Sequence, residues 1–201
     1  MEQVKRVERP TTVIFDDEVP RVPKRAAFFT RATYGDLGEK AKTERQRFAT
    51  KHPFALGMIP LIRNMVPLQD GPVEVGGEYD FSDAAANTRA IKSLSYMLGA
   101  DLTGICEIPR YAWFSHHENG EPVEMYHRYA VVMAIDQEYE TMEGASGDDW
   151  ISGAQSMRSY MRGAEIAGVM ADTLRGMGVS ARPQTNSDSD VLHIPLVLWA
   201  G

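Results

Sequence analysis

The sequence predicts an α+β fold, in which a helix, two short strands and a longer helix follow an extended N-terminal arm. The first helix is indicated by Ile91, Leu94 and Leu98, which recur at three- and four-residue spacing. The two strands are the apolar runs 101–105 and 128–135. Because a helix precedes two successive strands, helices and sheet should form separate layers.

The N-terminal arm is predicted to comprise residues 1–80, and the core residues 81–201. The arm is rich in proline and charged residues, and its apolar side chains occur in short islands at 13–15, 28–29 and 54–61. This composition is typical of a segment that wraps over a core rather than forming one.

The first helix of the core has a start and a stop signal. Ser82 or Asp83 can cap its amino end, and Gly99 is suited to end it. A polar loop of sequence HHENGEP, at 116–122, separates the two strands.

The longer helix is predicted over 150–177, and one of its faces carries unusually small side chains. Small residues allow another group to approach the helix backbone closely. The residues of this small face recur at helical spacing: Ala154, Met157, Met161, Ala164, Gly168 and Ala171.

The last part of the chain is polar and then apolar. Residues 180–191 favour β structure, and Pro195 is suited to the first turn of a further helix. The sequence ends inside that helix, so we expect the core to be incomplete at its C-terminus.

The overall charge argues against a nucleic-acid partner. The chain has 21 Lys and Arg against 28 Asp and Glu, a formal charge of −7, and lacks a basic stripe. The N-terminal residues lack the apolar core of a signal peptide, and no apolar run could span a bilayer. We therefore expect a cytoplasmic protein without a membrane partner.

Cys106 is the only cysteine. One thiolate cannot form an intrachain disulfide, a cysteine-rich zinc site or an iron–sulfur cluster. Any electron-transfer centre must therefore come from outside this chain.

Three histidines could suggest a metal site. His116 and His117 lie beside Glu118 in a predicted turn, and His127 follows ten residues later. Adjacent histidines in a polar loop rarely bind one ion, so a solvated hairpin is favoured and no metal ligand is assigned.

Two acidic groups have simple structural interpretations. Asp148 and Asp149 precede the long helix, where carboxylates cap free amides and interact favourably with the helix dipole. Asn186, Asp188 and Asp190 alternate as if on one strand face, but the glycine and terminal glutamate of a calcium loop are missing.

Tyr160 lies on the long helix one turn after Ser156 and beside the small face. Spacing alone favours a packed tyrosine with a satisfied hydroxyl. Its position next to small residues also allows the phenol to project into an adjoining pocket.

The run WISGAQSMRSYMRG at 150–163, with the sequence that follows it to Gly201, resembles the cobalamin-dependent reductive dehalogenases. The resemblance is closest to their cytoplasmic catabolic branch. It covers nearly the whole chain, because RVERPTTVIFDDEVPRVPKR near the N-terminus, ADLTGIC and YETM also fit that branch.

The resemblance implies a nitroreductase-like core that holds base-off cobalamin. By this comparison Tyr160 matches the catalytic proton donor, while Ser156 and Asn186 match polar residues of the substrate pocket. Gly163 and Ala164 are expected to contact the cofactor. In this family a downstream lysine or arginine tunes the tyrosine, and two 4Fe–4S clusters supply electrons; both would lie beyond Gly201.

The resemblance also implies the partners. The substrate would be an organohalide, such as a halogenated phenol or aromatic acid, and the electron donor a ferredoxin or a reductase. One alternative is a non-catalytic corrinoid-binding module or one half of a split enzyme. Another is a flavin-dependent nitroreductase relative, but the sequence lacks a recognisable cationic set for the flavin phosphate.

Overall fold

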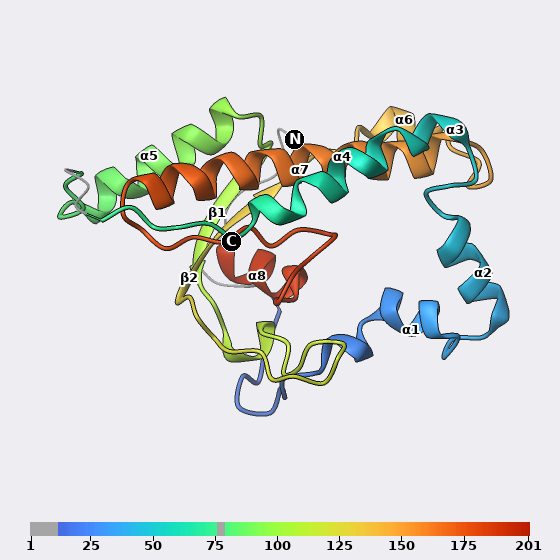
Figure 1. Ribbon diagram of the computed structural model, residues 1–201, viewed down its shortest axis with the longest axis horizontal. Helices are drawn as coiled ribbons and strands as arrows, with labels where there is room; N and C mark the ends of the chain where they lie inside the picture. The colour runs from blue at the N-terminus through green and yellow to red at the C-terminus, as the bar shows by residue number, and fades with distance from the viewer. Residues whose placement is uncertain (1–11, 76–78) are drawn as a thin grey trace.

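A small sheet lies between helices in the computed structural model, which describes residues 12–75 and 79–201 (Figure 1). In chain order the elements are η1 (Lys24–Ala26), α1 (Phe28–Tyr34), α2 (Glu39–Arg47), α3 (Pro53–Leu56), α4 (Met58–Asn64), η2 (Val66–Leu68), α5 (Ala84–Met97), β1 (Leu102–Glu107), η3 (Arg110–Ala112), β2 (Tyr129–Ala134), α6 (Tyr139–Glu143), α7 (Ile151–Gly176) and α8 (His193–Ala200).

The sheet consists of β1 and β2, which pair antiparallel with Leu102 opposite Ala134 and Glu107 opposite Tyr129. Alternate side chains of β2 point to opposite faces, as strand geometry requires. Ala130 and Val132 pack with α8, whereas Val131 and Met133 pack with α5 and α7. The predicted α+β layering is therefore confirmed.

The helices of the core follow their sequence signals. Asp83 caps α5, because its carboxylate accepts a hydrogen bond from the Ala86 amide at 2.9 Å. Gly99 follows the helix with φ +99°, a conformation that glycine adopts without strain. The long helix predicted over 150–177 is α7.

Within residues 12–75 the N-terminal arm forms four short α-helices. α3 and α4 pack along α7, where Ala55 and Ile62 are buried beside Ala154 and Met157. α1 and α2 lie apart from the layers of the core (Figure 1). The apolar island at 54–61 thus coincides with the part of the arm that contacts α7.

The segment between α7 and α8 differs from the prediction. Residues 180–190 form no strand, and only Val191 makes a β-bridge, to Trp113. The backbone of this segment turns back on itself, because the Thr185 amide donates to the Asp188 carbonyl oxygen at 2.9 Å and the Asp190 amide donates to Gln184 Oε1 at 2.7 Å. Pro195 lies in the first turn of α8, as predicted, although the helix begins at His193.

Within residues 12–75 and 79–201, none of the helices combines the length and the apolar character that crossing a membrane requires.

The contact between β1 and α8 gives a first prediction. A Cβ atom at Gly104 would lie 2.6 Å from Cβ of Ala200 and 2.7 Å from its carbonyl oxygen. Gly104→Ala should therefore force α8 away from the sheet and lower the free energy of unfolding by about 1–3 kcal/mol, measured by urea denaturation.

The matched control is Gly168→Ala on α7, where a Cβ would meet nothing within 4 Å. Removing a glycine from the interior of a helix should raise the free energy of unfolding by about 0.5–1 kcal/mol. Equal effects of the two substitutions would mean that the Gly104 contact does not fix α8.

Candidate functional site

Tyr160 and three other predicted site residues lie on successive turns of α7. Ser156 is four residues before Tyr160, and Gly163 and Ala164 are three and four residues after it, so all four lie on one side of the helix. Ser156, Tyr160 and Gly163 are half-buried. Ala164 is 5% exposed and is therefore covered by the chain itself.

The ring of Tyr160 packs against the cluster that joins α7 to the arm. Its buried members are Ala154 and Met157 of α7 with Ala55 and Ile62 of α3 and α4. The ring therefore lies beside the junction of α7 with the arm. The hydroxyl of Tyr160 makes no hydrogen bond within the described part of the chain.

The small face of α7 is largely occupied by protein. Near its start the arm passes so close that a Cβ at Gly153 would lie 2.7 Å from the Phe48 carbonyl oxygen. Met157 and Ala154 contact α3 and α4, whereas Gly168 borders open space. The close approach predicted for this face is therefore made, in its first half, by the arm.

Asn186 lies in the segment after α7 and is exposed. No hydrogen bond among the described residues joins it to Ser156 or Tyr160. Its neighbours Asp188 and Asp190 instead bind Arg182. The structure thus groups Ser156, Tyr160, Gly163 and Ala164 on α7, and among the described residues Asn186 is not hydrogen-bonded to them.

Arg182 is the centre of a polar cluster that the sequence did not indicate. Its Nε donates to Asp70 Oδ1 at 2.8 Å, and its Nη2 donates to Asp188 Oδ2 at 2.6 Å. Its Nη1 lies 3.6 Å from Asp190 Oδ2. Lys24 of the arm adds an ion pair to Asp188 at 3.3 Å. The cluster therefore links two residues of the arm, Lys24 and Asp70, to the segment that follows α7.

The charges of this cluster shift the pKa values of Asp188 and Arg182. Burial alone would raise the pKa of Asp188, but the hydrogen bond and charge of Arg182, with Lys24 nearby, hold it below its usual range. Burial alone would lower the pKa of Arg182, yet its carboxylate partners raise it. Both groups are therefore charged in neutral solution.

Tyr126 provides a contrast to Tyr160. Its hydroxyl donates to Asp190 Oδ2 and accepts from Gln184 Nε2, each at 2.8 Å. Burial, with the hydrogen bond to Asp190, raises the pKa of Tyr126 to about 12. Tyr126 is therefore a structural tyrosine that holds its proton.

The histidines form a hairpin rather than a cluster. His116 makes an antiparallel bridge to Pro122 and its ring contacts Ser115, whereas the His127 ring contacts Ser180. Within the described ranges no three His, Cys, Asp or Glu side chains come together as metal ligands.

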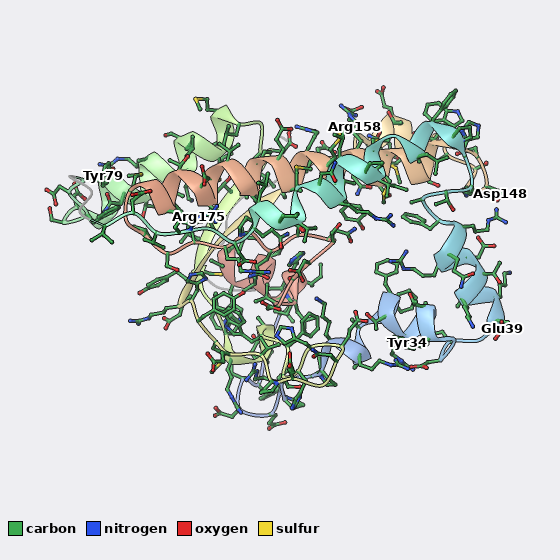
Figure 2. All side chains as sticks on the ribbon, in the orientation of Figure 1. Tyr34, Glu39, Tyr79, Asp148, Arg158 and Arg175 are labelled. Atoms are coloured by element: carbon green, nitrogen blue, oxygen red, sulfur yellow. The ribbon has the colours of Figure 1, made fainter. Side chains whose placement is uncertain are left out.

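Of the two aspartates before α7, Asp149 caps the helix as predicted and Asp148 does not. Asp149 Oδ1 accepts from the Ile151 amide at 2.8 Å, and Asp149 also binds Ser146. Hydrogen bonds from the Ser146 backbone and hydroxyl hold the pKa of Asp149 below its usual value. Asp148 instead pairs with Arg47 of α2, and Figure 2 shows it at the end of the molecule away from Arg175.

Arg175, near the C-terminal end of α7, is a buried cation held by backbone carbonyls. Its guanidinium donates to the carbonyl oxygens of Gln69 at 3.1 Å and Ala181 at 3.0 Å. It borders a hollow of about 260 Å³ that also includes Arg182, and a second hollow of about 570 Å³ is lined by Arg21 and Arg110. Neither includes a predicted site residue.

Comparison with known proteins confirms the resemblance seen in the sequence. Over 100% of its length the chain matches the catabolic reductive dehalogenase NpRdhA, with 57% sequence identity and a TM-score of 0.91. Further matches with the same identity are NpRdhA in complex with 3-bromo-4-hydroxybenzoic acid and a reductive dehalogenase described for B12-dependent dehalogenation, both with a TM-score of 0.90.

The chain spans 29% of the length of these relatives. No family model and no curated protein matches it.

The Arg182 cluster gives a pH-dependent prediction. An aspartate has a pKa of about 3.9 when unfolded, and that of Asp188 is lower in the folded chain. The unfolded state therefore takes up the proton first as pH falls. The contribution of Asp188 to stability is present above about pH 4 and is lost below it.

Asp188→Asn should lower the free energy of unfolding at pH 7 by about 1 kcal/mol, because the ion pairs are partly exposed. It should also flatten the loss of stability between about pH 5 and pH 3, measured by urea denaturation. Glu165→Gln, an exposed carboxylate on α7, is the control. An unchanged pH dependence in Asp188→Asn would contradict the prediction.

Proposed function

We propose that this chain is part of a cobalamin-dependent reductive dehalogenase, and that Tyr160 donates the proton to the dehalogenated carbon. The support is the identity of 57% with catabolic reductive dehalogenases over the entire chain. Tyr160 adds a half-buried phenol whose hydroxyl has no partner within the described residues, unlike that of Tyr126.

The proposed reaction replaces a carbon–halogen bond by a carbon–hydrogen bond. It consumes two electrons and one proton and releases a halide ion. Cys106, as a single cysteine, cannot hold an iron–sulfur cluster. As the resemblance to reductive dehalogenases implies, the electrons would reach the site from two 4Fe–4S clusters outside this chain, which a ferredoxin or a reductase would reduce.

In the proposed reaction, this chain would deliver the proton. In a pocket closed to water a carbon left with an extra electron pair needs a positioned acid. The Tyr160 Oη can give a proton, and its ring packs against the apolar cluster that joins α7 to the arm. A cation near the phenol would favour phenolate and so make it a better acid.

The fit to cobalamin is partial. Ser156, Tyr160 and Gly163 keep part of their surface on one side of α7, whereas Ala164 is covered by the chain. When bound, the cofactor would supply the cleavage of the carbon–halogen bond. Ser156, Tyr160 and Gly163 would then border it, and Asn186 would reach the substrate only from the segment after α7.

The proposal includes a nitroreductase-like core over residues 81–201 and an arm over residues 1–80, with cobalamin in the base-off form. The α+β layers and the contact of the arm with α7 support this division. The enzyme would act in the cytoplasm, as the resemblance to the catabolic branch suggests.

The proposed substrate is a halogenated aromatic compound. The relative NpRdhA is described in complex with 3-bromo-4-hydroxybenzoic acid, a halogenated phenol that is also an aromatic acid. At 57% identity a substrate of the same chemical class is the simplest expectation for this chain.

The alternative is a non-catalytic corrinoid-binding module or one half of a split enzyme. It would fit the single cysteine, which leaves this chain without a set of iron–sulfur ligands of its own. The affinity of the chain for cobalamin separates a carrier from a catalytic part.

We expect the chain on its own to bind cobalamin more weakly than about 1 µM, because a partial pocket leaves much of the cofactor in water. Isothermal titration calorimetry measures this directly. Submicromolar binding by the isolated chain would instead support the carrier.

Tyr160→Phe tests the proton donor, since it removes the hydroxyl and keeps the packed ring. Residues 1–201 replace the matched region of NpRdhA, and halide release is measured after reconstitution with cobalamin. Loss of a general acid should lower the rate by about 10²–10⁴-fold, with little change in cobalamin content.

Tyr129→Phe is the matched control, because Tyr129 is exposed on β2 and should keep the parent rate. A Tyr160→Phe enzyme that works within about threefold of the parent, below the range of general acid catalysis, would make Tyr160 a packing residue.

A further inference from the structure

Three buried polar atoms near the C-terminal end of α7 have no hydrogen-bond partner among the described residues. They are Gln69 Oε1, Arg175 Nε and Arg182 Nη1. Gln69 is 2% exposed and Arg175, labelled in Figure 2, is 4% exposed. Their residues line one hollow of about 260 Å³. Because a buried polar group without a partner costs free energy, this set points to an occupant that satisfies it.

The orientation of the Gln69 amide follows from its other contacts. Its Nε2 donates to Thr185 Oγ1 at 2.6 Å and to the Asp188 carbonyl oxygen at 3.4 Å. A backbone carbonyl can only accept a hydrogen bond, so the amide nitrogen must face Asp188. Oε1 of Gln69 is therefore left as a free acceptor.

The two arginines contribute one free donor each. Arg175 uses Nη1 and Nη2 for backbone carbonyls and Asp172, which leaves Nε. Arg182 uses Nε and Nη2 for Asp70 and Asp188, which leaves Nη1. The residues around the hollow thus offer two donors and one acceptor.

The charges around the hollow favour an anion. Arg182 is balanced by its carboxylate partners. The carboxylate that pairs with Arg175 belongs to Asp172, whose side chain is 83% exposed, and exposed ion pairs are weak. His127 also lines the hollow, but burial lowers its pKa and keeps it neutral at pH 7. The buried charge of Arg175 is therefore poorly compensated.

We propose that the hollow beside Arg175 is a binding site for hydrogen carbonate. Two oxygens of this planar monoanion accept from Arg175 Nε and Arg182 Nη1, and its hydroxyl donates to Gln69 Oε1. A simple carboxylate or a phosphodiester has no hydroxyl and would present only lone pairs to Gln69 Oε1. Inorganic phosphate has a hydroxyl but carries more negative charge, which the Asp70 carboxylate beside the hollow disfavours.

Gly71 keeps space free beside the Arg175 guanidinium. A Cβ atom at Gly71 would lie 2.9 Å from Arg175 Nε and 3.2 Å from its Cζ. An alanine at this position would therefore put a methyl group against the free N–H. This gives a substitution that blocks the site without removing any of its hydrogen-bonding groups.

The site is separate from the proposed proton donor. At about 1.5 Å per residue, Arg175 lies about 22 Å along α7 from Tyr160. The proposal therefore does not depend on the role proposed for Tyr160.

Isothermal titration calorimetry of the chain with sodium hydrogen carbonate, in a closed cell at slightly alkaline pH, tests the site. The expected Kd is about 0.1–10 mM, because a ligand of so few atoms cannot bind tightly. Formate at the same ionic strength is the matched ligand, since it keeps the planar carboxylate and the charge but lacks the hydroxyl. It should bind at least about tenfold more weakly, because Gln69 Oε1 stays unpaired.

Gly71→Ala should weaken the binding of hydrogen carbonate by at least about tenfold, because the methyl group occupies the space beside Arg175 Nε. Gly168→Ala is the matched control and should keep the parent affinity, since a Cβ there meets nothing within 4 Å. Circular dichroism melting shows whether each variant is folded. The comparison of the two anions needs no substitution, so it tests the site even if Gly71→Ala does not fold.

Several results would overturn the proposal. Formate binding as tightly as hydrogen carbonate would mean that the hollow takes any small anion, and tighter binding of inorganic phosphate would make it a phosphate site. No binding of any of these anions would leave water as the occupant. Parent affinity in Gly71→Ala would place the anion elsewhere. Binding by the chain but not by the cobalamin-loaded NpRdhA that carries residues 1–201 would mean that the whole enzyme covers the hollow.

Discussion

α7 is held from two sides, and every predicted site residue on it takes its position from these contacts. Ile166 and Met170 pack toward the sheet and α5, while Ala154 and Met157 pack against α3 and α4. Small side chains on α7 allow the second contact, because they let the arm approach the helix backbone. The ring of Tyr160 lies at the edge of this packing.

The core elements could be predicted from sequence because each has its own local signal. The bounds expected for α5, β1, β2 and α7 differ from the observed ones by at most two residues. Periodic apolar residues and the caps at Asp83 and Gly99 set these bounds. Helices α3 and α4, of four and seven residues, are too short to form without their contact to α7 and carry no comparable signal.

The polar contacts were less predictable. Arg182 and Asp70 are 112 residues apart in the sequence, and nothing local connects them. The alternation of Asp188 and Asp190 was visible, but their common partner was not. For Tyr160, spacing alone favoured a packing residue, and the resemblance to reductive dehalogenases gave it a role. The contrast with the doubly hydrogen-bonded Tyr126 is consistent with that role and comes only from the structure.

The ion pair between Lys24 and Asp188 can form only late in the synthesis of the protein. The two residues are 164 positions apart. At a synthesis rate of about 5–20 residues per second, Lys24 is added to the chain roughly 8–33 seconds before Asp188. For most of that interval Ala55 and Ile62 of the arm, which pack with α7 in the folded chain, have no finished partner to join. The apolar side of α3 and α4 is therefore uncovered until translation has passed the first half of α7.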